Sequence, residues 1–197
     1  MAIFFSSDQH FWHNKVISLC NRPFSNIEEM NSHLINNWNR VVQPEDTIYI
    51  LGDMFFCNTK KAEEILAQLN GKKILIVGNH DKFSLTKLKK MFHEVHYRLE
   101  LEIAGEKVQL SHYPYAPTKK EKFIHILKNF YKFWRKKKYM ELRYMDRRPI
   151  NNGGWLLHGH CHTAWQIKGK QFNVGVDVNE FYPVALESVE DLIRGKF

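Results

Sequence analysis

The sequence predicts an α/β fold, and three observations support this prediction. Short apolar runs at residues 2–7, 47–51 and 73–77 each end in a turn that carries polar residues. The segments between these runs place apolar residues at helical spacing. The chain of 197 residues is long enough for one domain with a sizeable core. Strands that alternate with helices in this way favour a sheet covered by helices.

The helical segments in the first half of the chain have identifiable ends. Residues 26–42 carry apolar side chains close to a helical period, with Ser25 or Asn26 available as the N-cap. Residues 60–69 predict a second helix, which Asn70-Gly71 closes with a C-cap signal. Residues 85–92 predict a short third helix.

The pattern changes after residue 94, where short strands follow one another. Residues 95–97, 99–103 and 107–110 predict antiparallel strands joined by turns. Residues 155–158 predict a further strand, and residues 165–167 and 171–174 flank Lys168-Gly169-Lys170 as a hairpin. Residues 188–194 predict a C-terminal helix. We expect one domain over residues 1–197, with residues 114–150 as an insertion within it.

The composition is that of an ordinary globular protein, with 44% apolar and 25% charged residues. No window approaches the roughly 18 uninterrupted apolar residues of a membrane span. The N-terminus lacks the basic region of a signal peptide. Three cysteines without C-x-x-C spacing indicate a reducing compartment. We therefore expect a cytoplasmic protein.

The net charge of +8 is concentrated in one segment. From Thr118 to Arg148, twelve Lys or Arg residues stand against three acidic ones, which gives this segment +9 and the rest of the chain −1. Apolar residues recur within it at helical spacing, so a basic helical insertion is predicted. It could be a solvated helix, a lid, or a surface for RNA or single-stranded DNA through Lys136, Lys137 and Lys138. The same mixture of charge and aromatic rings suits a peripheral contact with an anionic membrane.

Metal-ligating residue types gather directly after the predicted strands. Three of the seven Asp and five of the eleven His residues of the chain lie at these strand ends. Residues at i and i+2 of an extended segment face the same side, so the pairs at 8/10 and 160/162 could each address one point. The five strand ends carry Asp8 and His10, Asp53, Asn79 with His80 and Asp81, His112, and His160 with His162.

This ordered set resembles the motifs of the calcineurin-like metallophosphoesterases, in particular their small bacterial and phage branch. The motifs are D-x-H, G-D, G-N-H-D, a single His after a strand, and G-H-x-H, and the similarity covers residues 1–113 and 150–193. The resemblance implies a four-layer α/β/β/α sandwich of two mixed sheets, with the basic insertion before the last metal motif. It also implies a dinuclear centre. One ion would take Asp8, His10, Asp53 and His162, and the other would take Asp53, Asn79, His112 and His160.

Two divalent ions at such a centre suit the hydrolysis of phosphate esters. They favour a bound phosphate, and a hydroxide held between them would attack phosphorus. His80 would protonate the leaving oxygen or stabilise its developing charge, and Asp81 would orient His80. Ligands without thiolate suit manganese, with iron, zinc, nickel or magnesium as alternatives.

Residues beside the motifs offer further contacts. His13 and Arg22 are candidates for contact with the phosphate of a substrate. His158 precedes Gly159 and points away from His160, so it is predicted to be a packed core histidine. Cys161 is expected to be a small spacer between two ligands rather than a ligand itself.

The predicted function is a metal-dependent phosphodiesterase acting on a nucleotide or nucleic acid. The alternative is a pyrophosphohydrolase or phosphatase acting on a membrane-associated or other small phosphorylated substrate. His80 counts against the lipid-A-pathway pyrophosphohydrolases, which resemble G-N-R-D at this turn. A metal-free scaffold is a third interpretation, but every ligand position is intact. The residues after Asp53 do not follow G-D-x-x-D-R-G, which argues against a protein phosphatase.

Overall fold

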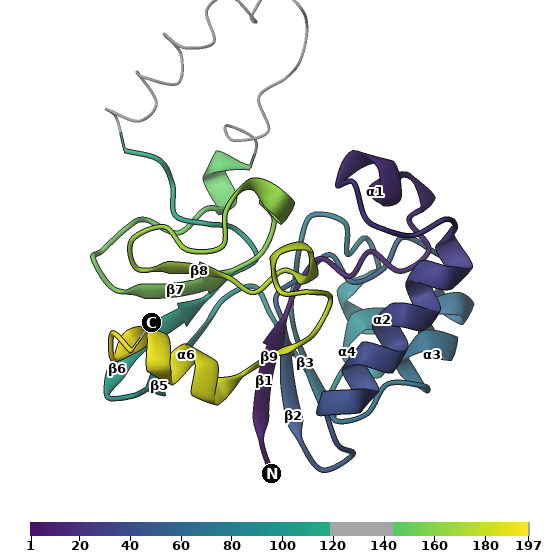
Figure 1. The fold of residues 1–197 in the computed structure, drawn as a ribbon, viewed down its shortest axis with the longest axis horizontal. Coiled ribbons are helices and arrows are strands. Elements are labelled where there is room, and N and C mark those ends of the chain that lie inside the picture. The colour runs from purple at the N-terminus through teal and green to yellow at the C-terminus, as the bar shows by residue number, and fades with distance from the viewer. Residues whose placement is uncertain (119–143, 197) are drawn as a thin grey trace, which may run out of the picture.

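The strands of the chain form two mixed sheets, seen in a computed structural model that describes residues 1–118 and 144–196 (Figure 1). The first sheet has the strand order β4-β3-β2-β1-β9, in which β1 to β4 are parallel and β9 is antiparallel to β1. Its strands are β1 (Ile3–Ser6), β2 (Thr47–Ile50), β3 (Lys72–Ile76), β4 (Glu94–His96) and β9 (Val184–Ala185).

The second sheet has the order β5-β6-β7-β8. β5 and β6 are antiparallel, as predicted, whereas β6, β7 and β8 run parallel to one another. Its strands are β5 (Leu99–Ile103), β6 (Glu106–Leu110), β7 (Trp155–His158) and β8 (Gln171–Asn173). The prediction of two mixed sheets is therefore confirmed.

The placement of β4 was wrong in the sequence prediction. β4 does not join the antiparallel strands but pairs in parallel with β3, with Leu75 opposite Val95. The reason is the intervening helix α4 (Leu85–Met91), which carries the chain back along the first sheet as a crossover connection. The predicted hairpin after β7 is reduced to one antiparallel bridge between Ile167 and Phe172.

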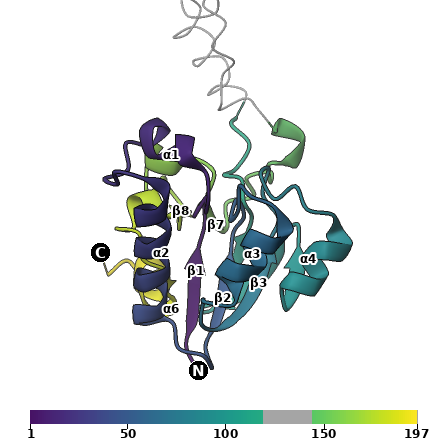
Figure 2. The ribbon, with the colours of Figure 1, turned by 90° about the vertical axis from the view of Figure 1, so that its right-hand side faces the viewer.

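Helices α2, α3 and α4 cover one face of the first sheet (Figures 1 and 2). α2 begins as predicted, because the Asn26 side chain accepts a hydrogen bond from the Glu29 backbone N–H. The described helices are α1 (Asn14–Leu19), α2 (Ile27–Val41), α3 (Thr59–Leu66), α4 and α6 (Leu186–Ile193), with 3-10 turns at Met145–Arg147, His162–Ala164 and Val176–Val178. None of these helices has the length and apolar character needed to cross a membrane.

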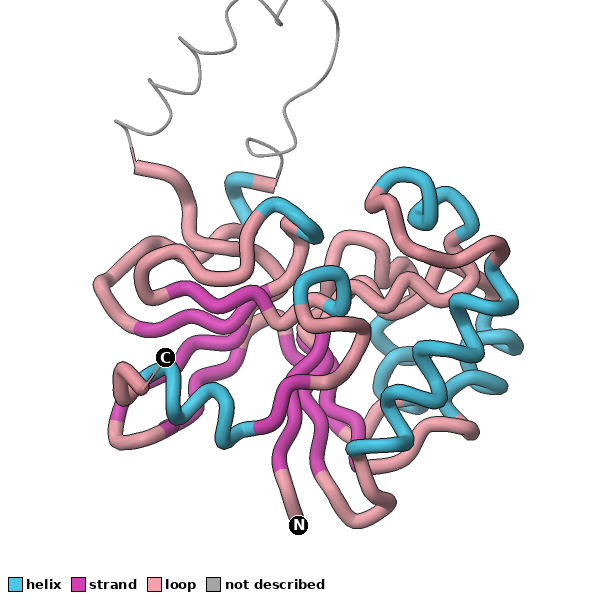
Figure 3. The backbone as a smooth tube through the Cα atoms, in the orientation of Figure 1, coloured by secondary structure: helices cyan, strands magenta, loops and turns pink. Residues whose placement is uncertain are grey.

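Two apolar cores explain why the strands of the first sheet are apolar on both faces. Successive residues of a strand face opposite sides. In β1, Phe4 therefore packs among the helices, whereas Phe5 packs in the core between the two sheets. Leu157 of the second sheet and Val189 of α6 belong to this inner core. The loops that leave the strands of both sheets meet in the middle of the molecule (Figure 3), and they carry the polar residues described next.

Candidate metal centre

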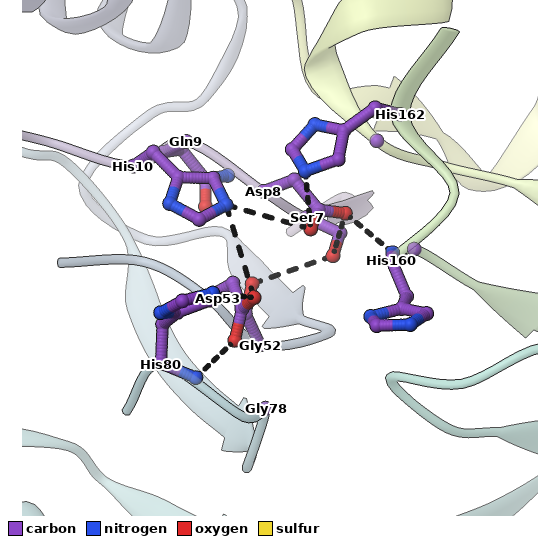
Figure 4. Close-up of polar contacts among 12 residues, drawn as sticks. Ser7, Asp8, Gln9, His10, Gly52, Asp53, Gly78, His80, His160 and His162 are labelled. Carbon is purple, nitrogen blue, oxygen red and sulfur yellow. Dashed lines mark hydrogen bonds and ion pairs between the residues drawn. The ribbon is translucent and has the colours of Figure 1, made fainter. Parts of the chain in front are cut away.

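The seven predicted ligands lie together where the two sheets meet, although they come from five separate turns. Figure 4 shows Asp8, His10, Asp53, His160 and His162 around this point. The sheets are joined here directly, because Asp8 Oδ2 accepts the backbone N–H of His160 at 2.8 Å and Ser7 forms a β-bridge with Gly175. The ligands follow β1, β2, β3, β6 and β7; they are Asp8, His10, Asp53, Asn79, His112, His160 and His162.

The backbone at these residues is left-handed rather than extended. β1 ends at Ser6, and φ is +59° at Asp8 and +54° at His10; φ at His160 is +69° and at His162 +45°. The prediction that each pair shares one side through strand alternation is therefore wrong. Each non-glycine residue with left-handed backbone angles lowers the stability of the fold by about 1–3 kcal/mol, and such residues cluster at functional sites. Backbone hydrogen bonds hold the first turn, from Asp8 N–H to Gly52 and from His10 N–H to Asp53 carbonyls.

Ligand atoms of Asp8, His10 and His162 converge in a first group, with Asp53 beside them. His10 Nε2 and His162 Nε2 each lie 3.9 Å from Asp8 Oδ1, and His10 Nε2 lies 3.8 Å from Asp53 Oδ2. Among the described residues, the buried atoms Asp8 Oδ1 and His10 Nε2 have no hydrogen-bond partner. Buried polar atoms that face one another without a hydrogen between them fit a bound cation.

A second group is built around His112. Its Nε2 atom lies 3.4 Å from Asp53 Oδ2 and 3.1 Å from Asn79 Oδ1. The His160 ring lies against the His112 ring, with 5.1 Å between their centroids. Among the described residues, however, His160 belongs to no group of three ligand atoms that all lie within 4.8 Å of one another. The carboxylate of Asp53 faces both groups. Two carboxylates, an amide oxygen and imidazoles, without a thiolate, form a donor set that fits two divalent cations.

Two of the histidines are oriented through their other ring nitrogen. His112 Nδ1 donates to the Leu51 carbonyl at 2.7 Å, and His162 Nδ1 lies 2.7 Å from Asp177 Oδ2. Such hydrogen bonds fix the ring so that Nε2 is directed at a metal. Asp177 was not predicted as a site residue, because it lies outside the five motifs, 15 positions after His162. The available signal was an acidic residue shortly after the last metal-type histidine in the sequence.

His13 orients the ring of His10 through a hydrogen bond to its other nitrogen. The two Nδ1 atoms are 3.2 Å apart, so one ring donates and the other accepts. If His10 Nε2 binds a metal, its Nδ1 carries the hydrogen and donates it to His13. Burial, together with the charge of His80, lowers the pKa of His13 to about 4, which leaves His13 neutral and able to accept. Its contact with a substrate phosphate stays a prediction.

Arg22 does not fit the predicted role of phosphate contact. Its side chain is fully buried, and all five N–H donors are engaged within the protein. Nε and one terminal nitrogen bind Asp177 at 2.8 and 2.9 Å, and other N–H groups reach the carbonyls of Asp8 and Gln9 and the sulfur of Met30. The prediction is wrong because Arg22 balances the buried charge of Asp177 and holds the turn that carries the ligands.

Asp81 also has contacts other than the predicted one. Both of its oxygens accept backbone N–H groups, from Gly78 at 2.8 Å, Asp53 at 2.9 Å and Met54 at 3.1 Å. No hydrogen bond among the described residues joins Asp81 to the His80 ring, so its predicted orienting contact is absent there. Asp81 instead fixes the turn that presents Asp53. Gly78 is required at this point, since an added Cβ would overlap Asp53 Oδ1.

The His80 ring lies at the accessible side of the centre. Its side chain is 33% exposed, and Nε2 lies 4.0 Å from Asp53 Oδ2. The His80 backbone N–H binds Asp53 Oδ1 at 2.7 Å, which fixes the loop next to the shared carboxylate. Burial lowers the pKa of His80, although the charge of Asp53 opposes this shift.

The charges of Asp53 and His112 shift each other's pKa. Burial alone would raise the pKa of Asp53, but His112 and His10 hold it well below its ordinary value. Burial would likewise lower the pKa of His112, but Asp53 raises it to about 9. Burial lowers the pKa of His160 to about 2. In the absence of metal, Asp53 and His112 therefore form a charged pair.

The remaining predicted residues lie apart from this centre or outside the described part of the chain. His158 is fully buried against Trp165, as predicted, and its Nδ1 binds the Gly159 carbonyl at 2.7 Å. The side chain of Cys161 is in contact with Asn173 at 3.4 Å. Lys136, Lys137 and Lys138, with most of the predicted basic insertion, lie outside the described residues.

Residues 1–188 match the family model for calcineurin-like phosphoesterases. The chain is 37% identical to an uncharacterized protein of Methanocaldococcus jannaschii over 98% of this chain and 93% of that one. It is 29% identical to the gene 66 protein of Mycobacterium phage L5, covering 88% of this chain and 85% of the phage protein. A crystal structure of a protein of unknown function from Aquifex aeolicus superposes with a TM-score of 0.66 and 28% identity, over 97% of this chain and 98% of that one.

Proposed function

The chain belongs to the calcineurin-like phosphoesterases, which are divalent-metal-dependent phosphoric ester hydrolases, and from this premise we propose that it is a phosphodiesterase acting on a nucleotide or nucleic acid. The observation that carries the proposal is the pair of ligand groups that share Asp53, with His80 at their accessible side. The engagement of Arg22 supports a diester, because this arginine has no donor left for the second negative charge of a phosphate monoester.

Two divalent ions would be held by the residues that converge on Asp53. Asp8, His10 and His162 would complete the first set, and Asn79, His112 and His160 the second, with Asp53 common to both. When bound, such ions supply Lewis acidity to the phosphoryl group and lower the pKa of a water molecule.

The protein contributes a positioned proton and a fixed frame. The negative charge of a bound phosphate opposes the lowering of the His80 pKa and therefore favours the protonated ring when substrate is bound. Nε2 then holds this proton for the leaving oxygen. Meanwhile the contacts of Asp177, Leu51 and His13 keep the ligand rings from turning.

A hydrolysis panel with Mn²⁺ tests this proposal. It compares bis-p-nitrophenyl phosphate, p-nitrophenyl phosphate, cyclic nucleotides, RNA, and single- and double-stranded DNA. We expect diesters to be cleaved faster than the monoester, and Asp53→Ala to lose both metal and activity because its carboxylate faces both ligand groups. Faster cleavage of the monoester would contradict the diester assignment, and two ions retained by Asp53→Ala would contradict the shared ligand.

The charge of the sequence supports a polyanionic substrate. The segment from Thr118 to Arg148 carries +9, more than the +8 of the whole chain. Replacing Lys136, Lys137 and Lys138 with Ala should weaken binding of single-stranded RNA or DNA and leave p-nitrophenyl esters nearly unaffected. The slope of log affinity against log salt should fall by about 0.7 for each lost phosphate contact. An unchanged slope would remove these lysines from the proposed nucleic-acid surface, and binding of the protein to anionic liposomes would then favour a membrane contact.

A further inference from the structure

A pocket of about 380 Å³ opens beside the candidate metal centre. This volume is within the range of about 300–1,000 Å³ that is usual for small-molecule sites. None of its lining residues belongs to the two ligand groups, yet His80 lines it and also faces Asp53. The lining residues are Phe55, Phe56, Cys57, His80, Lys82 and Phe83.

Three phenylalanine rings give the pocket aromatic walls. Phe55 is buried and meets Phe83 edge to face, with 6.5 Å between centroids. Phe56 is 44% exposed, although it is a large apolar side chain. His13 stacks on the Phe56 ring at 4.0 Å and 15°, which holds the ring in one orientation. A fixed and partly exposed aromatic ring offers a surface on which a planar group can stack.

The position of His80 relates the pocket to the reaction. Its Nε2 atom lies 4.0 Å from the carboxylate shared by both ligand groups, and its ring lies 5.5 Å from that of Phe56. A group in the pocket is thus next to the residue that serves the leaving oxygen. The ammonium group of Lys82 and the thiol of Cys57 add polar atoms to the lining. A ring with polar edges suits this lining better than an acyl chain, which has neither a flat face nor polar edges.

We propose that this pocket binds the nucleobase carried by the leaving group of the substrate, by stacking on Phe56. The proposal rests on the phosphodiesterase function proposed above and narrows its substrate to esters whose leaving group is a nucleoside. Phe56 is then a residue for substrate specificity, and His80 lies between the base in the pocket and the phosphate at the centre.

Fluorescence of a 2-aminopurine nucleoside monophosphate tests the binding step without requiring hydrolysis. Stacking quenches this base, so we expect quenching by the Mn²⁺-loaded protein, with ribose 5-phosphate a much weaker competitor than adenosine monophosphate. Phe56→Ala should weaken binding roughly 5- to 150-fold, the fold-change that corresponds to loss of one stacked aromatic contact. Phe56→Tyr should keep the affinity, and Phe56→Leu, which retains bulk beside His13 without a ring face, should lose most of it.

Tyr97→Ala is the matched control, because Tyr97 is an aromatic residue 69% exposed that does not line the pocket. Equal affinity of wild type, Phe56→Ala and Phe56→Leu would overturn the stacking assignment. So would a loss of the same size in Tyr97→Ala. Thermal unfolding of each variant separates loss of binding from loss of fold.

Dinucleotides link the pocket to the leaving group. With a dinucleotide whose cleaved bond is known from its products, removal of the base from the leaving nucleoside should raise KM far more than removal of the other base. The reverse order would overturn the assignment of the pocket to the leaving side. Hydrolysis of bis-p-nitrophenyl phosphate without any 2-aminopurine quenching would overturn the pocket proposal and leave the phosphodiesterase proposal standing. Quenching that depends on Phe56, without hydrolysis of any ester, would overturn the phosphodiesterase proposal and leave base binding in the pocket standing.

Discussion

The guanidinium of Arg22 ties together the segments that carry ligands from both sheets. It binds the carbonyls of Asp8 and Gln9 after β1, and the carboxylate of Asp177, which in turn holds His162. Because the ion pair is buried, removal of Arg22 leaves the carboxylate of Asp177 buried with His162 as its remaining partner. The stability of this region and the geometry of the metal ligands therefore depend on the same side chain.

Arg22→Ala should lower the free energy of unfolding by about 3–5 kcal/mol, because the charge of Asp177 stays buried. Asp177, which orients His162, would lose its contact with Arg22, and metal binding should therefore weaken by roughly 10- to 100-fold. Denaturant unfolding and metal titration measure the two effects. Lys107→Ala is the control, since Lys107 is 83% exposed and pairs with Glu100 at 3.3 Å on the surface. The control should change the stability by less than about 0.5 kcal/mol, and equal effects of both variants would contradict the assignment.

His80→Ala should retain the metals and slow hydrolysis by roughly 10²- to 10⁴-fold, the usual contribution of a general acid. The loss should be smaller for esters of p-nitrophenol, whose leaving group needs little protonation. Steady-state kinetics over leaving groups of different pKa measure this. Equal losses for all leaving groups would restrict His80 to a contact with phosphate.

Metal affinity should rise with pH because of His112. Its Nδ1 faces the Leu51 carbonyl and its Nε2 faces oxygens of Asn79 and Asp53, all acceptors, so both nitrogens carry hydrogens when no metal is bound. Its pKa, raised to about 9, keeps this form present at neutral pH. A metal must displace the proton on Nε2, so affinity should increase as pH rises toward about 9. Calorimetry in buffers of different ionisation enthalpy would show the released proton. Affinity that is constant from pH 6 to 9 would contradict this prediction.

At the level of elements, the strands and helices follow local patterns that the sequence displays. Apolar periodicity and an N-cap at Ser25 or Asn26 predicted α2 to within one residue at each end, and the cap is Asn26. The closeness of the seven candidate ligands could be predicted from the family motifs, and it fits parallel strands that end at the same edge of each sheet. The left-handed turns at Asp8 and His160 could not, because they depend on hydrogen bonds to distant segments, such as Asp8 N–H to the Gly52 carbonyl. The buried partners of Arg22 and Asp81 likewise arise from tertiary packing.

The turn after β7 is where the second sheet meets the first, and Gly159 permits the approach. A Cβ at this position would overlap Ser7 Oγ and Asp8 Oδ2. Gly159→Ala should therefore cost about 1–3 kcal/mol of stability and displace Asp8. Gly154→Ala is the matched control just before β7, since its nearest neighbour is the exposed Asn152 side chain at 3.1 Å. Denaturant unfolding and metal titration of both variants check this. Equal stability and metal content in the two variants would show that the contact between the sheets tolerates the methyl group.

For the whole molecule, the proposed centre is a link between the two sheets. Asp8 and Asp53 follow strands of the first sheet, whereas His112 and His160 follow strands of the second. Ions that bind these residues in the native state alone stabilise the fold by mass action, by about 2.7 kcal/mol for one site at a hundred times its dissociation constant.

Removal of metal by a chelator should therefore lower the unfolding temperature, and Mn²⁺ should restore it. Thermal unfolding with and without the chelator measures the shift. Asp53→Ala should show almost no shift, because both ligand groups lose a carboxylate. A wild-type unfolding temperature that does not depend on metal would contradict a centre that joins the sheets.

The hydrogen bond from His160 to Asp8 also sets an order of events during biosynthesis. Its partners are 152 positions apart, so it closes about three quarters of the chain into one loop. A growing polypeptide presents Asp8, Asp53 and His112 well before His160 and His162 leave the ribosome. Until then, the early residues form an incomplete binding site. We therefore expect metal loading to follow the docking of the two sheets. A chain interrupted before Gly159 would lack the last two residues of the proposed centre.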